Sequence, residues 1–196
     1  MWKGTKAMVK NDGTETNDKR FWDTFAGEMG EEVLQLRPVF DGFYANEFHG
    51  AKAACGENPL ARRAIDGLKA KGYDVVLATN PIFPLVGVET RLSWVGLRPE
   101  DFSYITAYEN STTCKPNPAY YAEILRNTGK RPQECLMVGN DATEDTAALE
   151  QGIGVYLVTD CLLNPKGRDI SGVPQGTFAA IFWSLPGCKS FSPFCD

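Results

Sequence analysis

The segment CLMVGNDATEDTAALEQGI, Cys135 to Ile153, decides the fold predicted for this chain. Its short apolar run, Leu136 to Val138, is typical of a strand buried on both faces. Gly139 follows the run and allows the sharp turn that ends the strand. A helical pattern then continues as far as Gly152. A strand that runs directly into a helix is the repeating unit of parallel α/β sheets.

Three polar side chains lie in the loop between that strand and that helix, namely Asn140, Asp141 and Asp145. Ligands of open α/β sheets bind outside the carboxyl ends of the strands, and clustered side-chain oxygens suit Mg²⁺. The loop therefore indicates a metal site. It also has a purely structural explanation, because Asp141 and Glu144 match a capping box and Asp145 would lie in the acidic first turn of the helix.

The rest of the chain divides into a helical part and an alternating part. Residues 1–56 show aromatic side chains at helical spacing and no strand pattern, which predicts a small helical unit packed on its neighbour. From residue 57, strand and helix patterns alternate, and strands are expected at 75–78, 104–107, 136–138 and 155–158. Strands separated by helices form a parallel, doubly wound sheet with right-handed crossovers. The tail from residue 161 is irregular, with one short apolar helix expected at 178–185.

The composition argues against several classes of partner. The formal net charge is -5 and no basic cluster stands out, which disfavours nucleic acid and anionic membranes. No apolar run approaches the roughly 18 residues of a membrane span, and the amino-terminal segment lacks the apolar core of a signal peptide. The expected location is the cytoplasm. A single histidine and scattered cysteines disfavour a zinc cluster and a histidine-based triad.

Three predicted strands end in loops with polar residues at one edge of the expected sheet. The loops carry Thr79 and Asn80, then Lys115, then Asp141 and Asp145. The hydroxyl and amide can donate to a phosphate, the ammonium can neutralise it, and the carboxylates can hold a bridging metal. Taken singly, the first loop is also explained as a strand-ending turn and the lysine as a solvated loop residue. Their order and common edge favour one phosphate-and-metal site.

These motifs resemble those of the haloacid dehalogenase superfamily, whose members are mostly Mg²⁺-dependent phosphatases. VVLATN is similar to the second motif at Thr79, CKPNPAYY to the third at Lys115, and VGNDATED to the acidic fourth motif at Asp141 and Asp145. The resemblance covers residues 57–160, and the helical unit before it is similar to the inserted cap of this family. It implies a cap at 1–56 and a Rossmann-like core at 57–196, with Mg²⁺ as cofactor and a small phosphorylated metabolite as substrate.

Two features depart from the family pattern. Asn140 stands directly after Gly139, where relatives more often carry an acid, so Asp141 is the better metal ligand and Asp145 is expected behind it. The first motif, a strand followed by D-x-D whose first aspartate is the nucleophile, is absent, since no D-x-D occurs in the 196 residues. In the family that strand precedes the cap and lies between the strands that end at Thr79 and Gly139. We therefore expect a truncated and inactive form.

Two functions are compatible with this sequence. In complete relatives an aspartate attacks phosphorus and the aspartyl-phosphate is hydrolysed. The resemblance implies a catalytic set with these members in this chain: Thr79, Lys115, Asp141 and Asp145. Thr79, Asn80 and Lys115 would hold the phosphate, and Asp141 and Asp145 the metal. The alternative is a non-catalytic module that binds phosphate and metal. A flavodoxin-like or receiver-type sheet ranks below both, because those folds place their acids after the first strand.

Overall fold

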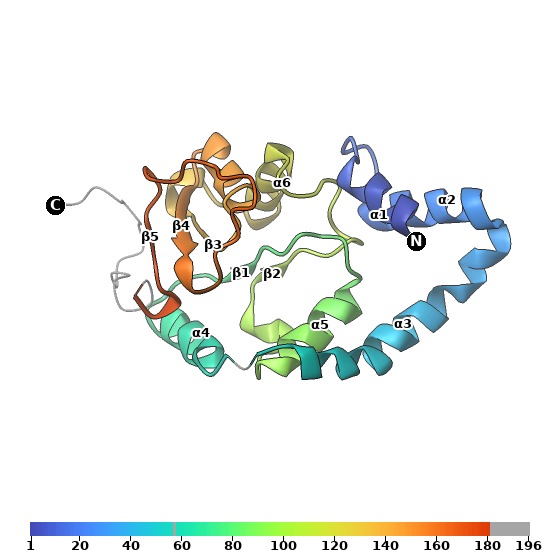
Figure 1. Cartoon of the computed structure of the whole chain (residues 1–196), viewed down its shortest axis with the longest axis horizontal. Helices are drawn as coiled ribbons and strands as arrows, with labels where there is room; N and C mark the ends of the chain where they lie inside the picture. The colour runs from blue at the N-terminus through green and yellow to red at the C-terminus, as the bar shows by residue number, and fades with distance from the viewer. Residues whose placement is uncertain (57, 181–196) are drawn as a thin grey trace. The chain divides into compact units, whose positions relative to one another are not determined.

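The computed structural model describes residues 1–56 and 58–180 of the chain (Figure 1). Its α-helices are α1 (Trp2–Val9), α2 (Asn17–Met29), α3 (Arg37–Ala45), α4 (Leu60–Ala70), α5 (Leu85–Trp94) and α6 (Pro118–Thr128). Its strands are β1 (Val76–Leu77), β2 (Tyr104–Ile105), β3 (Leu136–Gly139), β4 (Gly154–Val158) and β5 (Gln175–Gly176). Short 3-10 helices complete it: η1 (Glu31–Leu36), η2 (Glu47–Ala54), η3 (Pro99–Asp101), η4 (Pro132–Glu134), η5 (Asp145–Gln151) and η6 (Thr159–Cys161). No helix in this described part is long and apolar enough to cross a membrane.

The helical and alternating parts of the chain agree with the sequence patterns. The described residues before β1 form helices and their connections but no strand, and each of the four predicted strands is present. The segment that begins at Asp145 is a 3-10 helix, η5, where a regular helix was expected. The helix predicted at 178–185 lies for the most part outside the described residues.

The strands form two parallel sheets, which confirms the α/β class. β1 pairs with β2, and β3, β4 and β5 form a second sheet in that order. The four predicted strands therefore do not share one sheet. Within the described residues, β1 and β3 each have a strand neighbour on one side only. The residues of β3 are only partly buried, and Val138 is 37% exposed, so the prediction of a strand buried on both faces is wrong.

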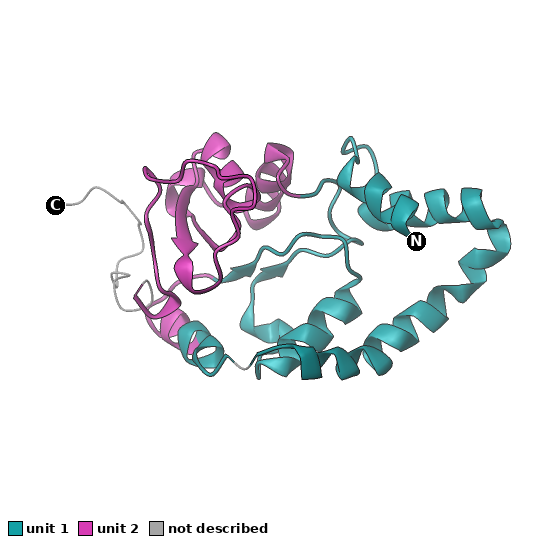
Figure 2. Ribbon diagram, in the orientation of Figure 1, with its two compact units in different colours: residues 1–65, 75–114 teal, residues 66–74, 115–196 magenta. Residues whose placement is uncertain are grey.

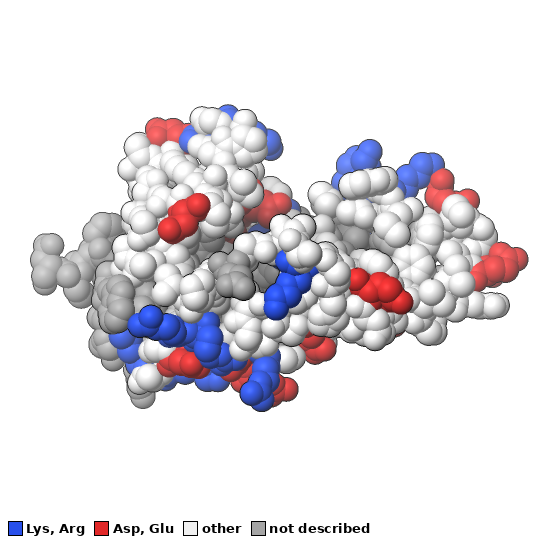
Figure 3. Space-filling view, turned by 60° about the horizontal axis from the view of Figure 1, so that its bottom comes forward, with Lys and Arg blue, Asp and Glu red and all other residues white. Residues whose placement is uncertain are grey.

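The chain divides into two compact units (Figure 2). Unit 1 contains residues 1–65 and 75–114, and unit 2 contains residues 66–74 and the described residues from 115 on. β1, β2 and α5 thus belong to the same unit as the amino-terminal helices. A cap restricted to residues 1–56 remains a prediction. Figure 3 shows charged side chains of both signs on one face, with lysines and arginines gathered over the part that carries α4.

Unit 1 has an aromatic core built by α2. Thr16 caps the start of this helix, because its hydroxyl accepts a hydrogen bond from the Lys19 backbone N–H at 3.3 Å. Phe21 and Trp22 then pack edge-to-face with ring centroids 5.4 Å apart. The Trp22 Nε1–H donates to Tyr108 Oη at 3.4 Å, and burial raises the pKa of Tyr108 to about 12. The aromatic stripe is a packed face, as its spacing predicted.

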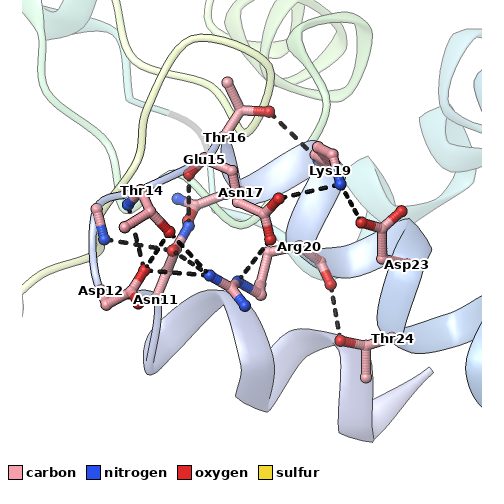
Figure 4. Close-up of polar contacts among 11 residues, drawn as sticks. Asn11, Asp12, Thr14, Glu15, Thr16, Asn17, Lys19, Arg20, Asp23 and Thr24 are labelled. Carbon is pink, nitrogen blue, oxygen red and sulfur yellow. Dashed lines mark hydrogen bonds and ion pairs between the residues drawn. The ribbon is translucent and has the colours of Figure 1, made fainter.

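A polar network joins residues of the α1–α2 loop to the first turns of α2 (Figure 4). One of its members, Asn17, also bonds to the segments that follow β1 and β2. Asn17 is fully buried, and its Nδ2 donates to the carbonyls of Pro81 and Thr113 at 3.2 and 3.4 Å. Its Oδ1 accepts from Asn11 Nδ2 at 2.9 Å. Because an unsatisfied buried polar group costs about 1–3 kcal/mol, these bonds fix the position of α2 within unit 1.

Glu109 gives unit 1 a predicted dependence on pH. Both of its carboxylate oxygens accept from the Leu85 N–H at the start of α5, at 3.0 Å. Partial burial raises the pKa of this carboxyl, the Leu85 N–H opposes that, and the charges of Asp18 and Asp41 add to the increase. The folded state therefore holds a proton at pH values where the unfolded chain has lost it. Stability contributed by this group is present at low pH and falls as pH rises from the ordinary carboxyl pKa of 4.5 to the raised folded pKa.

We expect Glu109→Gln to flatten this part of the stability profile, since glutamine retains an acceptor for the Leu85 N–H without the charge. The measurement is the free energy of urea unfolding between pH 4 and pH 8 for both proteins. Glu47→Gln, at an exposed carboxyl of the same unit, is the control. Parallel profiles for the wild type and Glu109→Gln would contradict the prediction.

Candidate functional site

The predicted site residues lie in two groups, one in each unit. Thr79 and Asn80 follow β1 in unit 1, whereas Lys115, Asp141 and Asp145 belong to unit 2. The structure brings the three residues of unit 2 together. The Thr79 carbonyl accepts from Thr106 Oγ1 at 2.8 Å, and the Asn80 carbonyl accepts from the Ile82 N–H at 2.9 Å. The grouping of Thr79 and Asn80 with the residues of unit 2 stays a prediction.

Lys115 forms a buried ion pair with Asp145. Its Nζ lies 2.7 Å from Asp145 Oδ1, and both side chains are 6% exposed. The interpretation of Lys115 as a solvated loop residue is therefore wrong. The ring centroids of Tyr120 and Tyr121 lie 5.7 and 5.9 Å from the same Nζ, which places the ammonium against two aromatic rings. Sequence reasoning missed both tyrosines, although they follow the lysine within CKPNPAYY.

The start of α6 positions these aromatic rings. Asn117 caps the helix, since its Oδ1 accepts from the Ala119 N–H at 3.0 Å. One turn later the rings of Tyr120 and Tyr121 meet edge-to-face with centroids 5.0 Å apart. Tyr121 Oη donates to the Glu144 carbonyl at 2.8 Å, and burial raises the pKa of this phenol. The protonated hydroxyl thus connects α6 to the acidic loop.

The acidic loop folds around the carboxylate of Asp145. Its Oδ2 accepts from the Asp141 N–H at 2.9 Å, while its Oδ1 faces Lys115. Gly139 is required at the end of β3, because a Cβ at this position would overlap the Asp145 carboxylate. Lys115 therefore holds Asp145, and Asp145 in turn fixes the backbone at Asp141.

Asp141 caps the helical segment that follows it, as its spacing to Glu144 suggested. This cap uses only one of its two carboxylate oxygens. Its Oδ1 accepts from the N–H groups of Thr143 and Glu144 at 2.7 and 2.8 Å, as a helix cap does. No hydrogen bond to its Oδ2 is present among the described residues. Asn140 is engaged elsewhere, because its Nδ2 donates to the Cys161 carbonyl at 2.8 Å.

One oxygen of this loop, Asp141 Oδ2, is a suitable ligand for a hard cation such as Mg²⁺. Asp141 Oδ2 is a carboxylate oxygen to which no described residue donates a hydrogen bond. Mg²⁺ is commonly held by one or two protein carboxylates together with water and phosphate oxygens. Both oxygens of Asp145 are engaged by protein groups. In the described part of the chain, no group of three or more histidine, cysteine or acidic side chains is arranged to hold a metal.

Most of the chain matches a known protein family. A family model described as "Hydrolase: haloacid dehalogenase-like hydrolase" matches residues 7–152. This range includes the loops after β1 and β3 and the start of α6. No curated protein matches the chain.

Several solved structures are similar in fold. A predicted phosphoglycolate phosphatase from Haemophilus somnus 129pt has 21% identity and a TM-score of 0.57, covering 91% of this chain and 80% of that one. A HAD phosphatase from Thermococcus onnurineus has 16% identity and a TM-score of 0.58, covering 94% and 87%. CbbY from Rhodobacter sphaeroides, in complex with phosphate, has 21% identity and a TM-score of 0.54, covering 67% and 59%. At these identities the similarity establishes the fold.

Proposed function

Because this chain belongs to the haloacid dehalogenase-like hydrolase family, we propose that it carries the anion-binding part of a phosphatase site for a small phosphorylated metabolite. The observation that supports the proposal most directly is the buried Lys115–Asp145 pair behind Asp141. The names of several similar structures also support a phosphorylated substrate. They include a predicted phosphoglycolate phosphatase, and a CbbY variant in complex with xylulose-(1,5)bisphosphate.

Each residue of the proposed site has a distinct task. Lys115 provides a cation that is shielded from water, so its attraction to a phosphate is stronger than at an exposed position. Its ammonium has three N–H donors, and Asp145 accepts from one of them. Thr79 and Asn80 are proposed to donate hydrogen bonds to the phosphoryl oxygens. Asp145 is proposed to orient Lys115 and the acidic loop.

Asp141 is the proposed ligand for Mg²⁺, through its free Oδ2. A bound Mg²⁺ would supply positive charge that offsets the charge of a phosphate dianion. The cap interactions of Asp141 Oδ1 hold the carboxylate in place for this role, since the side chain is already fixed by two backbone N–H groups. Preorganisation of this kind lowers the cost of binding.

The chain lacks the group that would attack phosphorus. No D-x-D occurs in its sequence, and we propose that this chain binds a phosphate without turning it over. Removing a nucleophile from a catalytic unit can lower turnover on the order of a millionfold. In complete relatives the strand with D-x-D lies beside the strands equivalent to β1 and β3. In the described part of this chain, each of these two strands has one side without a strand neighbour.

The test measures binding and turnover on the same protein. We expect release of p-nitrophenol from p-nitrophenyl phosphate with Mg²⁺ to stay at the background rate. Inorganic phosphate should bind more tightly with Mg²⁺ than without it, as followed by calorimetry. Asp141→Asn should remove the effect of Mg²⁺ and keep the fold, because asparagine retains an oxygen for the cap.

Asp169→Asn is the matched control for this experiment. Asp169 is an exposed carboxylate of unit 2 whose Oδ1 also accepts from a nearby N–H, that of Ser171 at 2.9 Å. Its replacement should leave the effect of Mg²⁺ unchanged. Rapid turnover that depends on Asp141 would contradict the proposal that this chain does not turn phosphate over. A protein that does not bind phosphate with or without Mg²⁺ would contradict the proposed phosphatase site.

A second candidate function is a non-catalytic module that binds phosphate and metal. It is favoured by one observation, namely that the Lys115–Asp145–Asp141 arrangement is formed in a chain without D-x-D. The coding sequence upstream of Met1 distinguishes the two. An in-frame strand with D-x-D would support the enzyme, and its absence would support the module.

A further inference from the structure

The acidic loop after β3 is joined to the segment that follows β4. The Leu163 N–H donates to the Asn140 carbonyl at 2.7 Å, and the Ala142 N–H donates to the Leu163 carbonyl at 2.9 Å. These two bonds lie on either side of Asp141, which pairs with Leu163 in a parallel β-bridge. Segment 161–163 and the acidic loop both belong to unit 2, so this contact lies within one compact unit.

The side chain of Asn140 adds a third hydrogen bond to the same segment. Its Nδ2 donates to the Cys161 carbonyl at 2.8 Å. An ionised aspartate has no donor and could not form this bond, although the two side chains have nearly the same size. The amide at position 140 therefore gives the acidic loop a contact that an acid at the same position would not make.

Segment 161–163 is itself anchored in unit 2. It follows β4, whose Leu157 is fully buried, and Leu162 packs against the apolar core that contains Leu157. Asp141 has further contacts with Asp145, since the Asp141 N–H donates to Asp145 Oδ2 at 2.9 Å and the Asp141 carbonyl accepts from the Asp145 N–H at 3.0 Å. The backbone at Asp141 is thus fixed by two separate sets of contacts, one from Asp145 and one from this segment.

We propose that Asn140 is a positioning residue, which fixes the acidic loop to segment 161–163 and so holds Asp141 Oδ2 in place for a cation. The inference rests on the proposed function, in which Asp141 is the Mg²⁺ ligand. Replacement of a residue that orients a metal ligand commonly lowers metal affinity by about 10–100-fold. In this role Asn140 affects Mg²⁺ binding through Asp141 and is not itself a ligand.

The experiment replaces the amide and follows inorganic phosphate binding by calorimetry at several Mg²⁺ concentrations. Asn140→Asp removes the donor to Cys161 and adds a carboxylate, whereas Asn140→Ala removes the donor alone. In both variants, the Mg²⁺ concentration that gives half of the gain in phosphate affinity should rise about tenfold or more. In Asn140→Ala, the affinity for phosphate without Mg²⁺ should equal that of the wild type, whereas a general loss of structure would lower it.

Amide hydrogen exchange gives a readout that needs neither metal nor phosphate. In both variants the N–H groups of Ala142 and Leu163 should exchange faster than in the wild type, because the acidic loop has lost one of its three bonds to segment 161–163. This measurement uses the protein without Mg²⁺, so it reports on the contact between the loop and the segment alone.

Asn164→Asp is the matched control for the loss of an amide donor. Asn164 is a partly buried residue of the same unit, and its Nδ2 also donates to a backbone carbonyl, that of Arg168, at 2.8 Å. This bond does not involve the acidic loop. Its loss should leave the dependence on Mg²⁺ and the exchange of the Ala142 N–H unchanged.

Three outcomes would overturn the proposal. Tighter Mg²⁺ binding in Asn140→Asp would show that position 140 is itself a metal ligand. An unchanged Mg²⁺ dependence in Asn140→Ala, or unchanged exchange of the Ala142 and Leu163 N–H groups in both variants, would show that the side chain of Asn140 does not hold the loop. Failure of the proposed function is recognised in the wild type, whose phosphate binding would then not depend on Mg²⁺, and it would refute the inference as well.

Discussion

Lys115→Met is expected to lower the free energy of unfolding by about 3–5 kcal/mol, because it leaves the Asp145 carboxylate buried without its partner. The ammonium and carboxylate are 2.7 Å apart and each side chain is 6% exposed. Methionine has a similar length and keeps the contact with Tyr120 and Tyr121, so the change isolates the charge. The measurement is urea unfolding followed by circular dichroism.

Lys130→Met provides the control in the same unit. Lys130 Nζ lies 2.9 Å from Asp74 Oδ2, but these side chains are 39% and 41% exposed. A solvent-exposed pair contributes about 0–1 kcal/mol, so this variant should change stability little. The double replacement Lys115→Met with Asp145→Leu should be less destabilised than Lys115→Met alone, since it removes both buried charges. Equal effects of Lys115→Met and Lys130→Met would contradict the prediction.

Gly139→Ala is expected to be comparably damaging, by about 3 kcal/mol or more, although it adds a single methyl group. The added Cβ would overlap the Asp145 carboxylate, so this carboxylate must move. Its movement breaks the contact with Lys115 and the hydrogen bond from the Asp141 N–H. The same measurement of unfolding applies, and Mg²⁺-dependent phosphate binding should be lost together with stability.

Gly27→Ala is the matched control for this substitution. Gly27 lies within α2, and no atom lies within 4 Å of a Cβ added there. Alanine in a helix interior is favoured over glycine by about 0.5–1 kcal/mol, so this variant should be slightly more stable than the wild type. A Gly139→Ala protein as stable as Gly27→Ala would show that Asp145 can be displaced without cost.

Most helices and strands could be predicted from the sequence because their signals are local. The limits of α5 follow from its apolar pattern between Pro84 and Gly96, and α2 begins where Thr16 offers a cap. The strand β5 was not predicted, since Gln175 and Gly176 show no apolar alternation. The separation of β1 from β3 was also not predictable from their own residues, because the partner of a strand is not specified by the strand alone.

The sequence predicted which residues form the candidate site. It predicted only part of the contacts that these residues make with one another. The spacing of Asp141 and Glu144 correctly indicated a helix cap. The same spacing does not predict what the second carboxylate oxygen of Asp141 binds. The burial of Lys115 depends on Tyr120, Tyr121 and Asp145, which come together only in the folded unit. The order of these residues along the sequence does not predict that they come into contact.

Within the described residues, β1 and β3 each have one side without a strand neighbour, and this has a consequence for the behaviour of the protein in solution. A strand with free N–H and C=O groups along one side is a template on which a strand of another molecule can add. In β3 this side carries a half-exposed apolar sequence, Leu136 to Val138, with no charged residue to discourage such addition. In the described part of the chain this side of β3 therefore offers a place for a strand of another molecule, and we expect association to increase with protein concentration.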